Sequence, residues 1–173
     1  VRALGGHIKP IKLPDDLPIW PLTTILHVEA ATSFDKLTRS GVTEGLNRWP
    51  GIFHQAHFTS AVDYVRANRI RTLWMERMER VFHEVDLYVQ GDDLAITNLT
   101  GHPSVVLPFG RRGQKEDDQP STLVFTGRLY GETELLAFSH AFQRQFEHHT
   151  LRPPIERWLA EAQKQKDPTD EPS

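Results

Sequence analysis

Apolar side chains recur along the chain with two periods, one typical of helices and one typical of short strands. The clearest helical pattern covers residues 61–83, where arginine and glutamate fill the polar faces. Ser60 and Asp63 form a variant capping box, so we expect this helix to begin there. Its predicted buried face consists of Val62, Val65, Ile70, Leu73, Trp74, Met78 and Val81. Similar patterns predict helices over residues 21–40 and 131–148.

Short apolar runs bounded by turn residues predict three strands, at residues 85–90, 104–108 and 121–126. The segment 7–14 also alternates, and its Pro10 restricts it to an edge strand or a strand end. Strands that alternate with helices favour an α/β fold. We therefore expect a small mixed sheet, at least partly parallel, that is covered by helices.

The rest of the chain is predicted to consist of loops, a last short helix and a tail. Residues 42–57 are punctuated by glycine and proline, and the run 111–120 has mixed charge, so both are expected to be loops. Pro153 precedes a short apolar pattern that predicts a last helix. Residues 164–173 are expected to be a disordered tail after a single domain over residues 1–163.

The first residues favour a fragment of a longer protein. Residues 1–4 have a helical pattern that Gly5 would terminate, so the body of that helix would lie upstream. The chain begins with Val1, which is also compatible with a natural terminus that has lost its methionine.

Composition narrows the classes of protein to consider. The chain has 173 residues, 38% of them hydrophobic, which is enough for one packed core. Its net charge of −3 argues against a nucleic-acid-binding domain, which is usually strongly basic. The absence of cysteine excludes disulfides, zinc–thiolate sites and a cysteine nucleophile, and it suits a cytoplasmic protein. No run approaches the ~18 apolar residues of a membrane span, so we expect no membrane partner.

Few residues suggest chemistry on their own. His54 and His57 have a spacing that could share a metal ion, but no third ligand stands at a matching distance, and a solvated loop is the competing interpretation. Asp92 and Asp93 follow a predicted strand end, where ligands of α/β proteins tend to bind. Paired acids are also common in ordinary turns. These residues predict no catalytic centre, no metal site and no cofactor.

Several segments together resemble the amidase signature family, which includes amide hydrolases and the A subunit of the tRNA-dependent amidotransferase. Residues 98–108 resemble its late motif, Asn-Leu-x-Gly-x-Pro followed by an apolar strand and a proline. Residues 125–136 resemble the start of its last main helix, and residues 67–89 resemble its arginine-bearing helix and the next strand. The resemblance covers roughly residues 2–155 and implies the C-terminal part of an amidase-signature α/β/α sandwich.

The resemblance implies cleavage or transfer of an amide C–N bond by a Ser–Ser–Lys triad, with a small amide as substrate of the intact enzyme. Nothing in this chain matches the Gly/Ser-rich loop and lysine of the family, so we assign no catalytic residue here and expect the chain alone to be inactive. The alternative hypothesis is a stand-alone binding or scaffold module that keeps the late fold without catalysis.

The late motif supplies the candidate site residues. Asn98, Gly101 and Pro103 match it, and Asp92 and Asp93 are added as candidates for a channel wall. The glycine and the proline are expected to shape the backbone rather than to contact substrate.

Two departures leave the substrate open. Gln90-Gly91 stands where many family members have Thr-Pro, and Phe109 stands where a cysteine is usual.

A cut through a larger fold also predicts self-association. Strands and helices that lose their neighbours would expose a strand edge or an apolar patch. The expected places are Leu73, Trp74 and Met78, or the strand from Ile8 to Leu13, and the simplest product is a two-fold dimer.

Overall fold

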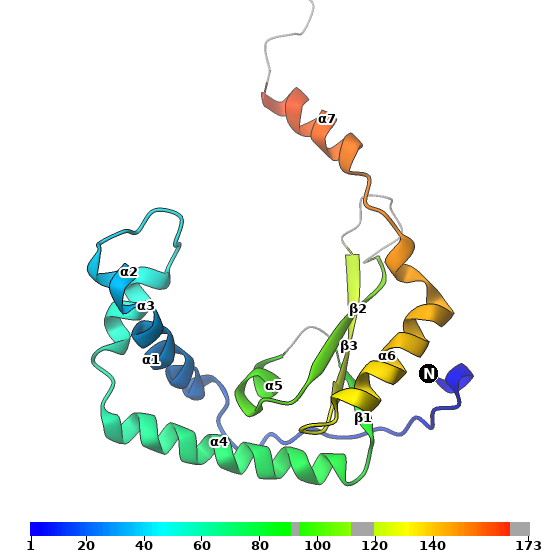
Figure 1. The fold of residues 1–173 in the computed structure, drawn as a ribbon, viewed down its shortest axis with the longest axis horizontal. Helices are drawn as coiled ribbons and strands as arrows, with labels where there is room; N and C mark the ends of the chain where they lie inside the picture. The colour runs from blue at the N-terminus through cyan, green and yellow to red at the C-terminus, as the bar shows by residue number, and fades with distance from the viewer. Residues whose placement is uncertain (91–93, 112–119, 167–173) are drawn as a thin grey trace, which may run out of the picture.

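The computed structural model describes residues 1–90, 94–111 and 120–166 as two lobes joined by one long helix, α4 (Figure 1). The first lobe is helical and contains α1 (Thr23–Ser33), α2 (Asp35–Arg39) and α3 (Trp49–Ala56). The second contains a three-stranded sheet with α6 (Glu132–Phe146) against it. Between the lobes, the short helix α5 (Ala95–Thr100) lies over α4.

Helix α4 (Ala61–Phe82) confirms the strongest sequence prediction. Its backbone starts at Ser60, whose hydroxyl accepts a hydrogen bond from the Asp63 amide at 3.1 Å. Part of the predicted buried face is correct, because Trp74 and Met78 are almost fully buried. Another part is wrong: Val62, Val65 and Leu73 are exposed. These three residues lie on a second apolar stripe of the helix, which the sequence analysis did not separate from the buried one.

The sheet has the order β1-β3-β2, with β1 (Leu87–Gln90), β2 (Ser104–Arg111) and β3 (Pro120–Gly127). The combination of helices with this sheet confirms the α/β class. Both neighbouring strand pairs are antiparallel, so the expected parallel pairing is wrong. The strand–helix–strand order did place β1 and β2 in the same direction. However, β3 lies between them, as in a split β-α-β unit, so no two parallel strands are neighbours in the described sheet.

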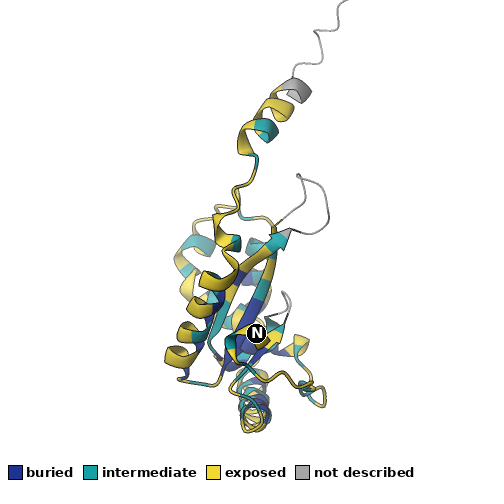
Figure 2. Ribbon diagram, turned by 90° about the vertical axis from the view of Figure 1, so that its right-hand side faces the viewer, coloured by how far each residue is buried: buried dark blue, intermediate teal, exposed yellow. Residues whose placement is uncertain are grey.

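Helix α6 covers one face of the sheet and completes its core. Leu107, Phe125, Leu135 and Phe142 form a buried cluster, and the rings of Phe125 and Phe142 meet edge to face at 5.0 Å. Figure 2 shows this burial between the sheet and α6.

The helical lobe corrects the prediction of a loop at residues 42–57. Residues Trp49–Ala56 form α3, with Pro50 in its first turn, where a missing amide costs no hydrogen bond. Phe53 and Ala56 are buried against Ala31 of α1, and Phe34 stacks on Phe53 at 5.3 Å. Burial against α1 therefore stabilises a helix that the glycine and proline content of the segment disfavours.

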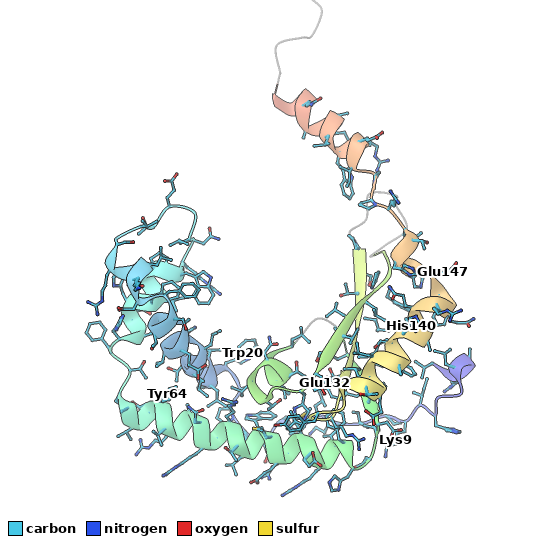
Figure 3. All side chains as sticks on the ribbon, in the orientation of Figure 1. Lys9, Trp20, Tyr64, Glu132, His140 and Glu147 are labelled. Atoms are coloured by element: carbon cyan, nitrogen blue, oxygen red, sulfur yellow. The ribbon has the colours of Figure 1, made fainter. Side chains whose placement is uncertain are left out.

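The N-terminal segment corrects a second prediction. Gly5, at φ 81°, ends a short 3₁₀ helix (Arg2–Leu4) in the left-handed conformation, as expected. Residues 7–14, however, form no strand; the described sheet contains β1, β2 and β3. Pro10 and Pro14 cannot donate to a ladder, and the segment is held instead by contacts such as the ion pair of Lys9 with Glu84 at 3.0 Å (Figure 3).

Two other boundaries differ from expectation. The predicted helix at 21–40 is preceded by a 3₁₀ turn (Trp20–Leu22) and is interrupted at Phe34, which separates α1 from α2. After a short 3₁₀ turn (His148–Thr150), α7 (Ile155–Lys166) projects from the body and is largely exposed (Figures 1 and 2).

Helix α7 therefore extends three residues into the expected tail. Residues 167–173 and most of the expected loop at 111–120 lie outside the described residues.

Candidate functional site

A groove of about 580 Å³ lies where α1, α4 and α5 meet. Figure 1 shows α1 and α5 on the same side of α4. Its lining residues are Ile19, Leu22, Thr23, Ile25, Leu26, Glu29, Arg71, Asn98, Leu99 and Gly101. The lining therefore combines five apolar side chains with a few polar groups, a combination that is common in small-molecule sites.

Helix α5 brings part of the late motif into this groove. Asn98 is exposed on α5, and Gly101 ends the helix at φ 80°, a left-handed conformation that glycine adopts without strain. Pro103 is not among the lining residues. Its carbonyl accepts a hydrogen bond from the Gly127 amide at 3.0 Å, so it holds the start of β2 against β3. Asp92 and Asp93 lie outside the described residues.

Arg71 supplies the positive charge of the groove. Its side chain is half-buried, and within the described residues it makes no hydrogen bond or ion pair. Glu29 contributes the other charged group, and it accepts a hydrogen bond from the Tyr64 hydroxyl at 3.0 Å. Figure 3 shows Tyr64 at the start of α4, close to α1. The groove therefore contains one arginine available to an anionic or carbonyl oxygen.

The floor of the groove is a hydrophobic cluster shared by three segments. Leu22 and Ile25 pack with Ala67 and Trp74, and all four are buried. The Trp74 indole N–H donates to the Pro18 carbonyl at 3.0 Å, which fastens the segment before α1 to α4. Leu26 is 54% exposed and lies at the rim. An apolar part of a ligand could cover this side chain.

His102 lies next to the groove residue Gly101 and is itself buried, at 5% exposure. Its Nδ1 lies 2.7 Å from the Thr100 hydroxyl, which also donates to the Ile96 carbonyl at 2.8 Å. Because the Thr100 hydroxyl donates its proton to the Ile96 carbonyl, it can only accept from His102, so Nδ1 carries the ring proton. Nε2 has no hydrogen-bond partner among the described residues, and the ring stacks on Phe82 at 5.2 Å. Burial lowers the pKa of His102, and the charge of Glu79 opposes that shift.

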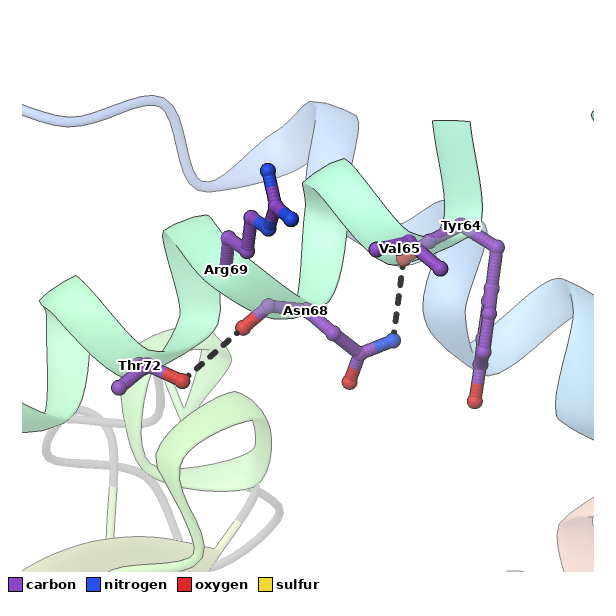
Figure 4. Close-up of a pocket in the computed structure, with 5 residues that line it drawn as sticks. All are labelled: Tyr64, Val65, Asn68, Arg69 and Thr72. Atoms are coloured by element: carbon purple, nitrogen blue, oxygen red, sulfur yellow. Dashed lines mark hydrogen bonds between the residues drawn. The ribbon is translucent and has the colours of Figure 1, made fainter. Parts of the chain in front are cut away.

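A second hollow, of about 320 Å³, is a shallow depression along α4 itself (Figure 4). The Asn68 side chain donates to the Tyr64 carbonyl at 3.1 Å, and the Thr72 hydroxyl donates to the Asn68 carbonyl at 3.2 Å. These polar groups serve their own helix, which leaves Arg69 and Val65 as the groups directed outward. The hollow contains no obvious catalytic arrangement.

The histidine pair considered from the sequence does not form a metal site in the described part of the chain. His54 lies on α3 rather than in a loop, His57 caps that helix, and both are exposed. No group of three or more histidine, aspartate or glutamate side chains suited to a metal occurs in the described ranges.

None of the helices in the described ranges is both long enough and apolar enough to cross a bilayer.

Sequence reasoning missed the arginine of the groove. From the pattern alone, Arg71 is one of several arginines on the polar faces of α4, and its half-buried position became evident only from the packing of α1 and α5. The one sequence clue was its place on the segment that resembles the arginine-bearing helix of the amidase signature family.

No protein-family model matches the chain, but curated proteins match parts of it. A Mycobacterium tuberculosis protein named amidase AmiD is 27% identical over 125 residues, which are 57% of this chain and 26% of that protein. The A subunit of glutamyl-tRNA(Gln) amidotransferase from Chloroflexus aggregans is 32% identical over 117 residues, 54% of this chain and 23% of the relative. Its counterpart from Staphylococcus carnosus is 24% identical over 152 residues, 71% of this chain and 30% of the relative. The chain thus spans less than a third of each of these relatives.

A solved structure agrees with the sequence matches. The crystal structure of a bacterial aryl acylamidase of the amidase signature family superimposes with a TM-score of 0.62 at 18% identity, covering 83% of this chain and 37% of that one. At this identity the likeness concerns the fold. Sequence and structure together show that the chain is related, over part of its length, to the amidase signature family and shares the fold of that part.

Proposed function

We propose that this chain supplies one wall of the amide-binding site of an amidase-signature enzyme. The observation that carries the proposal is the groove, in which Asn98 and Gly101 of the late motif lie beside Arg71, a half-buried arginine without a partner in the described residues. Residues from three segments far apart in the sequence therefore line one concave surface. Relatives named as an amidase and as amidotransferase subunits support amide chemistry for the protein of which this fold is a part.

The lining suits the two ends of an amide. The carbonyl oxygen of an amide, or a carboxylate attached to it, needs hydrogen-bond donors, which Arg71 and the Asn98 side chain can supply. The substituent on carbon or nitrogen is often apolar, and Ile25 and Leu26 can contact it. A simple anilide has both features and is therefore a suitable probe.

The catalytic groups belong outside these residues in this proposal. Among the described residues no serine hydroxyl makes a hydrogen bond with a lysine amine, and Lys9 and Lys12 are engaged in ion pairs with Glu84 and Asp15. A serine needs a base to take its proton before it can attack an amide carbon. The relatives are more than three times as long as the matched part, which leaves room for the Ser–Ser–Lys triad elsewhere.

The absence of cysteine supports a cytoplasmic location.

Strand pairing beyond this chain is part of the same proposal. In the described sheet, β1 and β2 each pair on one side only, so each has a free edge. The exposed Val89 and Val106 lie on these edge strands. A further strand of the same protein or of a second copy would satisfy their backbone groups.

Titration of the 173-residue protein with acetanilide, followed by amide NMR, tests the proposal. We expect shifts at Asn98, Leu99 and Leu26, and an affinity at least about fivefold weaker in Arg71→Ala. Arg80→Ala is the matched control, because Arg80 is exposed on the same helix away from the groove. Equal losses in both variants, or shifts on another surface, would contradict the proposed wall.

The same samples test the location of the triad. We expect no release of aniline from acetanilide and no hydrolysis of glutamine. Hydrolysis that a serine-directed inhibitor abolishes would show that this chain contains its own nucleophile. Binding without hydrolysis would leave the stand-alone binding module as the competitor, and the coding sequence upstream of Val1 would then decide, because a Ser–Ser–Lys enzyme requires a Gly/Ser-rich loop and a lysine there.

A further inference from the structure

Two opposite charges line the groove between α1, α4 and α5 without neutralising each other. Glu29 of α1 and Arg71 of α4 both belong to the lining, yet they form no ion pair with each other or with any other group in the described residues. Arg71 has a role in the proposed amide wall, whereas Glu29 has none there. A carboxylate without a cation in a binding groove can hold a cationic group of a ligand.

Tyr64 fixes one oxygen of this carboxylate. Its hydroxyl donates to Oε1 of Glu29 at 3.0 Å, and within the described ranges the Glu29 side chain accepts no other hydrogen bond. Figure 3 shows Tyr64 at the start of α4, close to α1. Because Glu29 is exposed, a ligand can reach Oε2 while Oε1 stays with Tyr64.

The two charges lie towards opposite ends of an apolar strip. On α1, Ile25 and Leu26 precede Glu29 by one helical turn, so the three side chains share a face. On α4, Tyr64 and Arg71 are two turns apart on one face, which is about 10 Å along the helix axis. Because Tyr64 contacts Glu29, the carboxylate lies at one end of the groove and the guanidinium extends from the other.

We propose that Glu29 is a specificity residue that selects amides whose apolar substituent ends in a protonated amine. The inference rests on the proposed amide wall, in which Arg71 and Asn98 bind the carbonyl oxygen. The substituent then lies along Ile25 and Leu26, and an ammonium at its far end meets Oε2 of Glu29. The contact is a charge-assisted hydrogen bond. A carboxylate in the same position would face a like charge.

The exposure of Glu29 limits the size of the effect. Ion pairs at exposed sites contribute little, because water solvates both partners and salt screens them. The Tyr64 hydroxyl holds the carboxylate in place, which reduces the conformational freedom that is lost when a ligand binds. We therefore expect the amine to improve the affinity about threefold to fivefold, and about 0.5 M salt to remove most of this gain.

Two acetanilides of the same shape test the inference. The first, 4-(aminomethyl)acetanilide, has an ammonium at the end of the ring opposite the amide. The second, 4-ethylacetanilide, has a methyl group in its place and no charge. Each is titrated into the 173-residue protein and followed by amide NMR. We expect both to shift groove residues such as Leu99, and the amine to bind about threefold to fivefold more tightly.

Variants at Glu29 show whether its charge causes the preference. Glu29→Gln keeps the shape of the side chain and an oxygen for Tyr64, so the two affinities should become equal. Glu29→Lys should instead bind the anionic 4-acetamidobenzoate more tightly than the wild type does. Glu132→Gln is the matched control, because Glu132 is an exposed glutamate of α6 in the other lobe, and it should keep the preference for the amine.

The two compounds separate this inference from the proposed function. Binding of 4-ethylacetanilide to the wild type reads the amide wall alone, because this compound has no charge. If it binds in the groove but the amine gains nothing, or if the gain persists in Glu29→Gln, the inference is wrong and the amide wall stands. If 4-ethylacetanilide shifts no groove residue, the amide wall fails and the inference fails with it.

Discussion

Trp74 offers the sharpest test of the packing beneath the groove. Its side chain is 2% exposed between α4 and the segment before α1, and its indole N–H donates to the Pro18 carbonyl at 3.0 Å. Trp74→Phe keeps an aromatic ring but removes this donor at a cost of about 0.5–1.5 kcal/mol, because Pro18 is exposed and water can reach its carbonyl. The smaller ring adds a cavity worth about 1 kcal/mol. We therefore expect the free energy of unfolding to fall by about 1.5–2.5 kcal/mol, a sizeable share of the usual range of about 5–15 kcal/mol.

Trp20→Phe is the matched control. Trp20 is 67% exposed, so the same chemical change should alter stability by no more than about 0.5 kcal/mol. Urea unfolding followed by far-UV circular dichroism measures both variants, and an unchanged slope would show that the denatured state is comparable. If the two variants lost equal stability, the indole hydrogen bond and the burial of Trp74 would not stabilise the junction of α1 with α4.

Two further predictions concern the late motif. Because burial lowers the pKa of His102, the unfolded chain binds a proton there more readily than the folded one, so the free energy of unfolding should fall as the pH drops below about 6.5. Urea midpoints measured at about pH 7.5 and 5.5 should differ less in His102→Phe than in the wild type. An equal difference in both proteins would contradict the prediction. Gly101→Ala should lower stability by about 1–2 kcal/mol, because φ at this position is +80°. Gly51→Ala should raise stability by about 0.5–1 kcal/mol, because Gly51 lies inside α3 with open space around it. Thermal unfolding measures both variants, and effects of the same sign would refute the backbone argument.

Local sequence was sufficient wherever one face of an element meets one core. The Ser60 cap and the buried spacing of Trp74 and Met78 predicted α4, and the leucine and phenylalanine pattern predicted α6. The three strands also lie where apolar runs placed them. In each of these cases the period of the pattern and the end residues act over a few positions, so the sequence contains the information locally.

Tertiary structure decided the features that depend on distant neighbours. Whether residues 7–14 form a strand depends on a partner with free backbone groups, and two prolines remove donors from that segment. Whether 49–56 form a helix depends on burial of Phe53 against α1, which outweighs the local effect of Pro50 and Gly51. The order β1-β3-β2 follows from the insertion of β3, which no strand pattern specifies.

The candidate site shows the same division. The sequence identified Asn98 and Gly101 through a motif, because their spacing in the chain is short and specific. It could not bring Arg71 or Leu26 to them, since these residues lie on helices whose relative position is set by the packing of Leu22, Ile25 and Trp74. Helical periodicity determines which residues share a face, but only the packing of one helix on another determines which faces meet, and a groove forms between faces.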